Sequence, residues 1–573
     1  MIKLRTTHPC RAAMLAGCLA LAACQSRTNL SATGNAPAQY SHVYLTVTQV
    51  WFNASATAGP TDSGWSQYTL SSPVTLDLVA LADGALSQLA SNLKVSPGSY
   101  GQMRLILADP SATLTASAQS GGALSNDEVD YTDSAGTLHQ VPLGIPNSAE
   151  GIGISTNLTV SGGGASGLGA LSSSPGDSST TSGLGIGTSS TSGSSPTSVV
   201  ATTSAIIDFD ATRDLVPVSL SGQEGFLLIP HPTVYSGTVG TIAGSVNLSG
   251  IAVTATTGVP DVQVAAEGVS GDGSRHTIVK TTLVSASGSF TLYPLDTASN
   301  TPSTYDLVIH GPAIDTVIVK SVPVASGAPG AAVVQLGTIP LTSAGAMAVN
   351  LSTSAPVSPS ASSVGFYQTL PLSGEIPYLI ELRNADPGSG VFAADQSLSA
   401  GSLEYATYSS AGSTLALTAT APTEGAATYH VAAFNSPYGQ GPMTTTVASA
   451  GSSTATFTAG AIPLPSGASA ATVGGTISVA SPGTYDKGEL LFTQNGVVVA
   501  AAPLDAFLSV AQSTGTLATG IPGGSGTTLG ATYYAEAWVW NSSDPLGTLS
   551  RQPYTGSIDL SSGNGTGIAL AIQ

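Results

Sequence analysis

Apolar and polar residues alternate along many short stretches of the chain, which is the pattern of β-strands with one buried face. Residues 41–50 are the clearest case, because Val43, Leu45 and Val47 alternate there with more polar neighbours. A second such strand is expected over 100–107. Most of the apolar stretches therefore predict half-buried strands rather than helices.

One segment has helical spacing instead. Leu81, Leu86, Leu89 and Leu93 recur at intervals of three to five residues, which predicts a short helix or helical turn before Pro97. Elsewhere Gly, Pro, Asn and Ser bound the apolar runs, and the residues that favour long helices are scarce. We therefore expect an all-β protein.

The stretch 533–540 carries aromatic residues on one strand face. Tyr534, Trp538 and Trp540 share that face with Glu536, whereas smaller apolar residues dominate the other face. If the small-residue face packs inward, an aromatic strip with one carboxylate is exposed and could bind a glycan. If the tryptophans fill a sandwich core, no site remains, and the high average burial of tryptophan favours this second interpretation.

Length and composition set the scale of the molecule. The chain has 573 residues, of which 8% are charged. At about 150 residues per domain, this length predicts three or four domains. We expect several tandem β-sandwich domains, transthyretin-like or immunoglobulin-like, behind an N-terminal lipoprotein signal.

The N-terminus carries the features of that signal. Three basic residues precede an apolar run at 12–23, which is too short to cross a bilayer as a helix. Leu21-Ala22-Ala23-Cys24 closes the run and resembles the bacterial lipobox, which implies cleavage before Cys24 and acylation of that cysteine. A plain secretory signal that happens to contain a cysteine is the alternative.

These features predict a bacterial cell-envelope protein that is anchored in membrane lipid through acylated Cys24. Gln25 follows the cysteine, where Asp would resemble a signal for retention in the inner membrane. We therefore expect the outer membrane.

Charge and cysteine content exclude several classes of partner. Thirteen Lys and Arg, three of them within residues 1–23, stand against 32 Asp and Glu, so the mature chain has a net charge of about −22. A balance this acidic argues against binding nucleic acid. Cys10 and Cys18 leave with the signal, so neither a disulfide nor a cysteine metal site is expected.

No catalytic constellation stands out. The seven histidines show no metal-ligand spacing, and neither H-E-x-x-H nor G-x-S-x-G occurs. The acidic residues of 126–130 with Asp133 could ligate Ca²⁺, but solvated turn and strand ends are the favoured interpretation. Asp208 and Asp210 share a strand face, which we expect to be exposed or paired with Arg213. We expect no cofactor, no metal and no enzymatic activity.

Several motifs between residues 40 and 235 follow the order of a known family. They are Leu76-Asp77-Leu78, Leu81, Gly84, Pro97-Gly98-Ser99-Tyr100, Arg104-Leu105, Val141-Pro142, Gly151-Ile152-Gly153-Ile154, Ile207-Asp208-Phe209-Asp210-Ala211 and Leu227-Leu228-Ile229-Pro230. This part of the chain resembles the domain of unknown function 4382 family of bacterial lipoproteins. The family has no established activity, so the resemblance implies no catalytic residue.

The chain departs from the family pattern at 161–200, where 29 of 40 residues are Gly, Ser or Thr. Such a segment buries too little apolar surface to offset its ordering entropy, so we expect a disordered insertion. It would be an expanded hairpin tip, since the family pattern resumes after it, with an interdomain linker as the alternative.

The rest of the chain shows further sandwich signatures. Gly271-Asp272-Gly273, 288–292 and 305–309 give residues 236–349 a resemblance to the carboxypeptidase regulatory-like domain, which implies a transthyretin-like β-sandwich with an accessory role. Tyr429 begins a stretch similar to an immunoglobulin strand with a corner tyrosine. Residues 473–477 are similar in sequence to 240–246. The similarity indicates either a weak internal repeat or only the composition that Gly- and Thr-rich first strands share.

The predicted organisation has six parts. They are a signal peptide at 1–23, a flexible tether at 24–38, the family-like domain at 39–235, a carboxypeptidase regulatory-like sandwich at 236–349, an immunoglobulin-like sandwich at 350–468 and a C-terminal sandwich at 469–573. The expected function is non-enzymatic: structure, adhesion or binding, with a glycan or an envelope protein as partner. Carbohydrate binding through Tyr534, Glu536, Trp538 and Trp540 is the alternative, and a hydrolase using acidic residues is a third class.

Overall fold

The computed structural model describes most of the chain after the predicted signal. The described residues are 26–110, 112–133, 135–145, 151–161, 201–220, 223–251, 261–270, 273–297, 304–326, 334–353, 363–384, 396–412, 415–420, 428–435, 439–440, 445–448, 452–457, 468–494, 497–525 and 530–573. Most of them lie in β-strands that form several sandwiches, so the expected all-β fold class is confirmed. The predicted insertion at 161–200 lies outside the described residues except for residue 161.

The first module, residues 26–235, is a sandwich of two sheets. The order of the smaller sheet is β12-β9-β1-β4, and that of the larger is β10-β11-β7-β6-β2-β5-β8 with β3 beside β2. Its strands are β1 (Ser26–Asn35), β2 (Tyr40–Asn53), β3 (Ser66–Asp77), β4 (Ser87–Leu93), β5 (Gly98–Leu107), β6 (Glu128–Thr132), β7 (Leu138–Gly144), β8 (Ile152–Val160), β9 (Ala201–Asp210), β10 (Leu215–Leu220), β11 (Gln223–Leu228) and β12 (Thr233–Tyr235). Two short helices, α2 (Ala116–Ser120) and α3 (Ala211–Asp214), connect strands of this module.

The flexible tether predicted over 24–38 is wrong, because strand β1 occupies most of it. β1 pairs in parallel with β9 along its whole length, from Ser26 opposite Ala201 to Asn35 opposite Asp210. Leu30 is fully buried in the module core. The strand is held by pairing with a segment far along the chain, which local composition cannot reveal.

Of the short helix or helical turn predicted before Pro97, only a single turn is present, in which the Leu81 N–H donates to the Asp77 carbonyl oxygen at 3.1 Å. Asp83 and Gly84 have positive φ angles of 60° and 77°, a left-handed turn that ends any helical path. The chain then enters β4, which pairs with β1. Leu81 and Leu89 are buried in the same sandwich core, so their spacing reflects a turn followed by a strand.

Three further modules share one topology. In each, the first strand lies between an antiparallel neighbour and the last strand, which runs parallel to it; the three small sheets are β16-β13-β20, β24-β21-β30 and β34-β31-β38. The facing sheets have the orders β15-β14-β17-β18, β23-β22-β27-β28 and β33-β32-β35-β36. Residues 240–246 and 473–477, whose sequences are similar, thus lie in strands of equivalent position.

The bounds of these elements follow the chain. The second module contains β13 (Val239–Val246), β14 (Gln263–Val269), β15 (His276–Leu283), β16 (Ser289–Asp296), β17 (Thr304–His310), β18 (Thr316–Pro323), β19 (Ala325–Ser326) and β20 (Val334–Ile339). The third contains β21 (Ala346–Thr353), β22 (Ser363–Gln368), β23 (Tyr378–Asn384), β24 (Gln396–Ser399), β25 (Leu403–Thr407), β26 (Thr418–Thr420), β27 (Thr428–Asn435), β28 (Gly439–Gln440), β29 (Thr445–Ala448) and β30 (Ser452–Phe457). The fourth contains β31 (Ser469–Val479), β32 (Lys487–Gln494), β33 (Val497–Pro503), η2 (Asp505–Phe507), β34 (Gln512–Gly523), β35 (Thr532–Trp540), α4 (Pro545–Thr548), β36 (Ser550–Pro553), β37 (Ile558–Asp559) and β38 (Gly565–Ile572).

The second and third modules are joined by a shared sheet. β25 pairs in parallel with β18, so a hairpin of the third module extends the sheet of the second. The boundary predicted between residues 349 and 350 is therefore wrong: it falls inside β21, whose partners among the described strands, β24 and β30, belong to the third module. The Tyr429 hydroxyl donates to the main-chain oxygen of Ser399 at 2.9 Å, a bond that links the two sheets of the third module.

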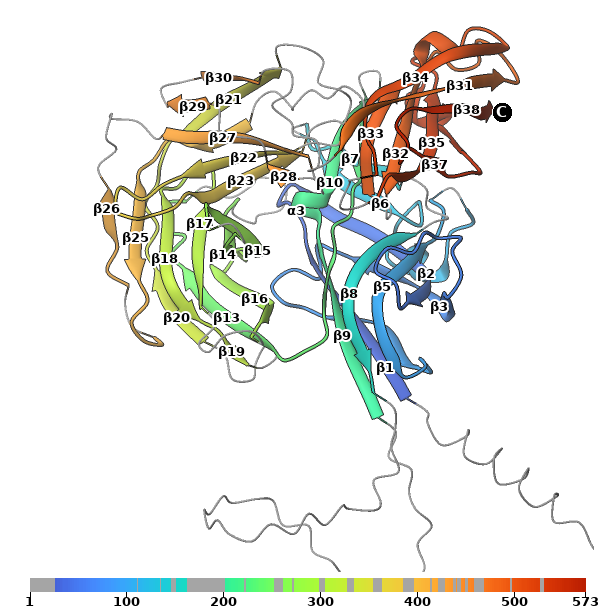
Figure 1. Ribbon diagram of the computed structural model, residues 1–573. Helices are drawn as coiled ribbons and strands as arrows, with labels where there is room; N and C mark the ends of the chain where they lie inside the picture. Colours follow the sequence, from blue (N-terminus) through green and yellow to red (C-terminus); the bar gives the residue numbers. More distant parts are fainter. Residues whose placement is uncertain are drawn as a thin grey trace, which may run out of the picture.

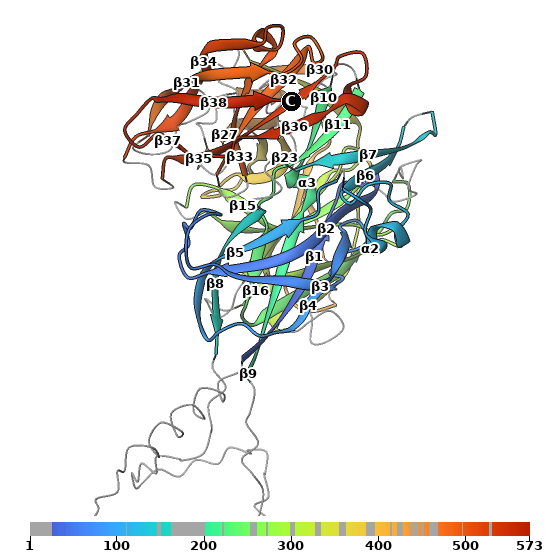
Figure 2. The ribbon, with the colours of Figure 1, turned by 90° about the vertical axis from the view of Figure 1, so that its right-hand side faces the viewer.

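The modules do not form an open string. Figure 1 shows the second and third modules to one side of the first, and the fourth module folded back above it. The view in Figure 2 agrees, with the fourth module against β10 and β11 and the starts of β1 and β9 at the opposite end. The C-terminal module thus contacts the first despite the length of chain between them.

Candidate functional site

The aromatic strip of β35 is buried, so the predicted glycan-binding surface is wrong. Trp538, Trp540 and Glu536 are only 4%, 6% and 3% exposed. The small-residue face of β35 packs into the core of the fourth module together with Tyr533, as the first interpretation assumed. The opposite face does not fill that core, and Tyr534 is half-buried.

The first module covers the strip. One apolar cluster combines residues of both modules: Val216, Val218, Leu227 and Ile229 from the first, and Leu491, Val498, Ala501, Trp538 and Trp540 from the fourth. The Trp538 ring lies so close to Gly144 that a Cβ there would be 1.9 Å from its Cη2 atom. Its indole N–H donates to the Glu536 carboxylate at 2.5 Å. The strip is therefore an interface between modules.

Polar contacts surround this interface. The guanidinium of Arg551 pairs with Asp109 at 2.8 Å and donates to the main-chain oxygen of Ile145 at 3.2 Å. A Cβ at Gly59 would lie 2.7 Å from the Tyr534 hydroxyl. Three of the four predicted binding residues thus help to hold the fourth module, and Tyr534 lies at the margin.

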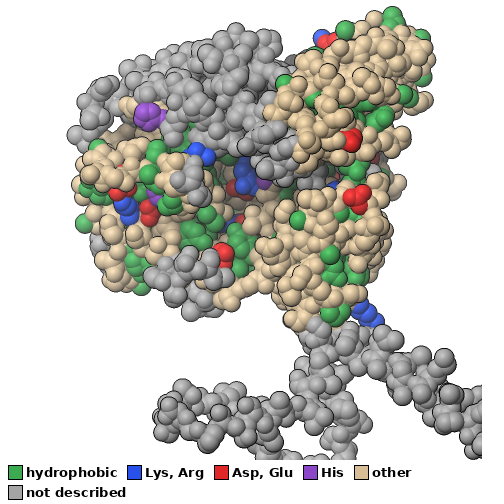
Figure 3. All heavy atoms as spheres, in the orientation of Figure 1, with side chains coloured by type: hydrophobic (Ala, Val, Ile, Leu, Met, Phe, Trp, Pro, Cys, Tyr) green, Lys and Arg blue, Asp and Glu red, His purple; other side chains and the backbone are tan. Residues whose placement is uncertain are grey.

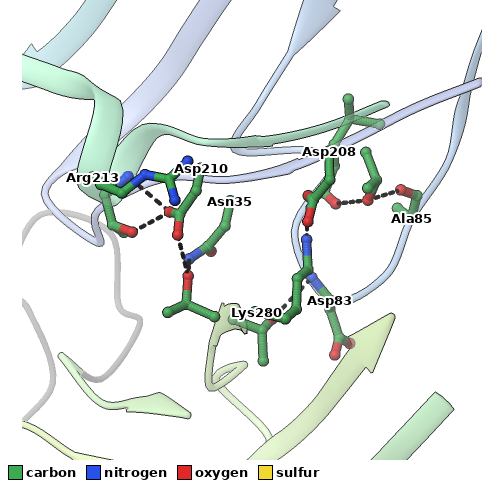
Figure 4. Close-up of polar contacts among 12 residues, drawn as sticks. Asn35, Asp83, Ala85, Asp208, Asp210, Arg213 and Lys280 are labelled. Atoms are coloured by element: carbon green, nitrogen blue, oxygen red, sulfur yellow. Dashed lines mark hydrogen bonds and ion pairs between the residues drawn. The ribbon is translucent and has the colours of Figure 1, made fainter. Parts of the chain in front are cut away.

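Asp208 and Asp210 face the second module, and their predicted exposure is wrong. Lys280 of β15 forms an ion pair with Asp208, and the two side chains are 4% and 7% exposed (Figure 4). Burial raises the pKa of the Asp208 carboxyl, and the Lys280 ammonium offsets only part of that effect. Arg213, the partner we predicted, forms its ion pair with Asp214, with 3.0 Å between Nε and Oδ1, and attracts Asp208 and Asp210 electrostatically.

The next two residues of β15 extend the same contact. Thr281 accepts a hydrogen bond from the Asn35 amide at 3.0 Å and donates to Asp210 at 2.8 Å. The Thr282 hydroxyl accepts the main-chain N–H of Asp83 at 3.2 Å (Figure 4). Figure 3 shows charged side chains in the hollow between these modules, whereas the outer surface carries few.

The acidic segment 126–130 is also buried, which contradicts the solvated turn that we expected. Asp127 accepts the main-chain N–H of Thr46 at 2.7 Å. The Glu128 carboxylate accepts two main-chain N–H groups at 2.9 and 2.7 Å. Asp133 alone lies in the predicted hairpin turn, where its side chain accepts two main-chain N–H groups. Within the described residues, no cluster of three or more His, Cys, Asp or Glu is arranged to hold a metal ion.

A cavity of about 670 Å³ lies where the first, second and fourth modules meet. Its walls are residues 153–157 of β8 and the segment 230–239, which includes β12. Asp296 of the second module and Gln494 of the fourth complete it. This volume is within the range of small-ligand sites, about 300–1,000 Å³.

Comparison with known proteins places the first module in a family. The family described as "Domain of unknown function (DUF4382)" matches residues 27–230. This match covers most of the first module, which we call the DUF4382 domain. The match begins within β1, in agreement with the pairing of β1 in the sandwich.

Other comparisons add little. No curated protein matches the chain. Six chains of solved structures match; one, described as "The Bacillus anthracis TIE protein", aligns over 96% of this chain and 73% of its own, at 10% identity and a TM-score of 0.13. A score this low carries no argument about fold or function. The resemblance of residues 236–349 to the carboxypeptidase regulatory-like domain stays a prediction.

The Asp-Phe-Asp motif of the DUF4382 domain has a structural role in this chain. Phe209 is buried in the domain core, while the carboxylates on either side of it bind β15. Sequence reasoning missed Lys280 and Arg551 as the partners that tie other modules to the domain. The signal that could have found them is the small number of Lys and Arg residues. In a chain with so few cations, each one is a candidate partner for a buried carboxylate.

Glu128 of the DUF4382 domain predicts a stability that depends on pH. Burial, followed by the nearby Asp130 carboxylate, raises the pKa of Glu128 to about 7. The folded state therefore holds a proton that the unfolded state releases near pH 4.5, and this stabilisation is lost as the pH rises from about 4.5 to 7. Glu128→Gln keeps a donor toward Asp130 and should reduce the fall of the urea midpoint between pH 5 and pH 8.

The control for this experiment is Asp559→Asn. Hydrogen bonds from Ser561 lower the pKa of Asp559, so its carboxyl titrates below this window. The control should leave the difference between pH 5 and pH 8 unchanged. An unaltered difference in Glu128→Gln would contradict the assignment of the proton to Glu128.

Proposed function

We propose that the chain is a non-enzymatic, lipid-anchored protein of the bacterial outer membrane, in which four packed β-sandwich modules act as a binding or structural body. The observation that carries the proposal is the lipobox-like sequence Leu21-Ala22-Ala23-Cys24 directly before the first strand of the DUF4382 domain. Cys24 itself lies outside the described residues. None of the helices in the described part of the chain is long and apolar enough to cross a membrane.

The position of β1 gives the anchor a short reach. Ser26 is two residues after Cys24, and two extended residues span at most about 7 Å. The parallel register of Ser26 with Ala201 brings the starts of β1 and β9 to the same end of the domain. That end would therefore rest at the lipid surface, with the fourth module at the far side of the body (Figure 2).

Two cations support this orientation. Arg27 is three residues after the anchoring cysteine. Thr28 lies opposite Leu93 in the antiparallel pair of β1 and β4, so Arg27 lies beside Lys94. Arg27 donates to the Asn92 side chain at 3.0 Å, and Lys94 is exposed. Each cation near an anionic headgroup layer contributes about 1 kcal/mol, so this end suits a membrane although the whole chain is acidic.

The arrangement of charged groups supports binding or structure rather than catalysis. The carboxylates that stood out in the sequence, in 126–130 and at 208 and 210, are engaged in main-chain contacts or in contacts between modules. None of them lines the cavity, whose walls carry both neutral polar and apolar residues. The partner would be a component of the envelope.

The anchor is tested by Cys24→Ser in the native host. We expect an unacylated product that leaves the membrane fraction, with mass spectrometry showing no fatty acid at its N-terminus. Cys18→Ser, which changes a cysteine inside the predicted signal, should remain acylated and membrane-bound. Membrane retention of Cys24→Ser, or a wild-type N-terminus free of fatty acid, would contradict the anchor and favour the plain secretory signal.

A further inference from the structure

The start of β23 contacts the second module through polar groups. β23 is the last strand of its sheet and pairs there with β22. The Leu379 N–H donates to the Glu267 carboxyl group of β14 at 3.3 Å. The Pro377 carbonyl oxygen accepts the main-chain N–H of His276 at 2.7 Å. The His276 ring also stacks on the Tyr378 ring, with their centroids 4.0 Å apart. A titratable carboxyl group therefore takes part directly in the contact between the two modules.

Glu267 is buried in this contact and lacks a cation. Its side chain is 1% exposed. One carboxyl oxygen accepts the Leu379 N–H, and the other has no hydrogen-bond partner. In the part of the chain that the structure describes, no Lys or Arg pairs with it. An ionised carboxylate in such surroundings is strongly unfavourable, and a buried group of this kind is more stable when it holds a proton.

A second carboxyl group stands opposite Glu267. Asp306 of β17 is its direct partner in the antiparallel pair of β14 and β17. The two Asp306 oxygens accept the Tyr378 hydroxyl at 2.8 Å and the Ser321 N–H at 2.7 Å, which suits an ionised carboxylate. Like charges at directly opposite positions destabilise a sheet, so this pair favours one charge over two. Because Glu267 receives only one N–H, it is the member that keeps its proton.

The electrostatics of the contact agree with this assignment. Besides Asp306, the titratable or charged groups on the elements packed around it are His276 of β15, Lys320 of β18, Tyr367 of β22, Glu375 before β23 and Tyr378 of β23. Lys320 and Glu375 form an ion pair with each other. Burial raises the pKa of Glu267 well above its usual range; the Leu379 N–H offsets part of this effect, and Asp306 adds to it.

We propose that Glu267 is a proton-controlled latch: its neutral carboxyl group holds the start of β23 against the second module, and its ionisation opens this contact to water. Apolar side chains of the second module, Ala265, Val308 and Ile318, pack into the core of the third. The two modules therefore stay joined when the latch opens, and the change is confined to the start of β23. The inference does not depend on the lipid anchor.

The sign of the pH dependence follows from the proton that the closed contact holds. The open, hydrated contact releases this proton near pH 4.5, the ordinary value for glutamate. The equilibrium constant for opening therefore rises by up to about tenfold per pH unit above pH 4.5, until the raised pKa of Glu267 is reached. His276 acts in the opposite sense, because burial lowers its pKa: the closed contact gains stability as the pH rises toward 6.5.

The first test compares hydrogen exchange of the full wild-type chain with that of Glu267→Gln, which keeps an acceptor for the Leu379 N–H but cannot ionise. Rates are measured by mass spectrometry at each pH from 5 to 9. Because both proteins are compared at the same pH, intrinsic exchange and the contribution of His276 cancel in the ratio of their rates. For peptides from 378–384, the ratio of wild-type to variant rates should rise by up to about tenfold per pH unit and then level off.

Glu404→Gln is the matched control. Glu404 is also a buried glutamate beside the second module, in β25, but its carboxyl group accepts the Thr342 hydroxyl at 3.1 Å. Its neighbours in the sheet, Val317 and Ala419, carry no charge. For the same 378–384 peptides, the ratio of wild-type to Glu404→Gln rates should not change with pH.

Infrared spectroscopy detects the proton itself, whether or not the contact opens. A protonated carboxyl group has a C=O stretch that an ionised carboxylate lacks. The spectrum of the wild type minus that of Glu267→Gln should contain one such band at pH 5, and the band should fade at the pH where the exchange ratio levels off. The proposal would be overturned by a difference spectrum without this band, by an exchange ratio that is constant from pH 5 to 9, or by the same pH dependence in Glu404→Gln.

Discussion

Trp538→Ala will release the fourth module from the DUF4382 domain while leaving both parts folded. The Trp538 side chain is almost fully buried in the apolar cluster between the modules, next to Leu227 of β11. Removing a buried tryptophan side chain costs about 3–5 kcal/mol. The face of β35 that fills the core of the fourth module is the opposite one, so the substitution acts on the contact between modules.

Small-angle scattering should show a larger radius of gyration for Trp538→Ala, and limited proteolysis should cleave between the third and fourth modules. Gly144→Ala tests the same contact from the other side, because its new Cβ would lie 1.9 Å from the Trp538 ring. Gly345→Ala is the control, since no atom lies within 4 Å of a Cβ at that position. Unchanged scattering for both interface variants would contradict the docked arrangement.

The alternation of apolar residues predicted strands well where both partners lay close in sequence. Val43, Leu45 and Val47 are all fully buried in β2, as their period requires. β1 was missed because Leu30 and its neighbours are held by β9, a pairing that composition does not encode. The leucines around Gly84 show the converse error, in which a turn and a strand imitate the period of a helix.

The position of the aromatic strip was predicted less well. From the sequence we considered exposure to solvent and burial in a sandwich core, but not burial between two modules. β35 is apolar on both faces apart from Glu536, and strands apolar on both faces are generally covered on both sides. This signal favoured a second packing surface. The identity of that surface, β10 and β11 of the DUF4382 domain, depends on how modules far apart in the chain fold back on one another.

Lys280→Met should separate the second module from the DUF4382 domain, by a different physical route. The variant leaves the Asp208 carboxylate buried without its cation, and removing one partner of a buried ion pair costs about 3–5 kcal/mol. Hydrogen exchange should then accelerate at Thr281 and Thr282, whose hydroxyls bond the same domain. The double variant Lys280→Met, Asp208→Leu should recover most of the loss, because it leaves no unpaired charge.

The pH dependence of the variant gives an independent check on this ion pair. Burial already raises the pKa of Asp208, and loss of Lys280 removes the group that lowers it, so the folded variant takes up a proton more readily. A raised carboxyl pKa stabilises the folded state at low pH and loses that contribution as the pH rises. The penalty of Lys280→Met should therefore shrink as the pH falls toward the unfolded-state value of about 4. A penalty independent of pH, or a double variant as unstable as the single one, would show that Lys280 acts through packing rather than through its charge.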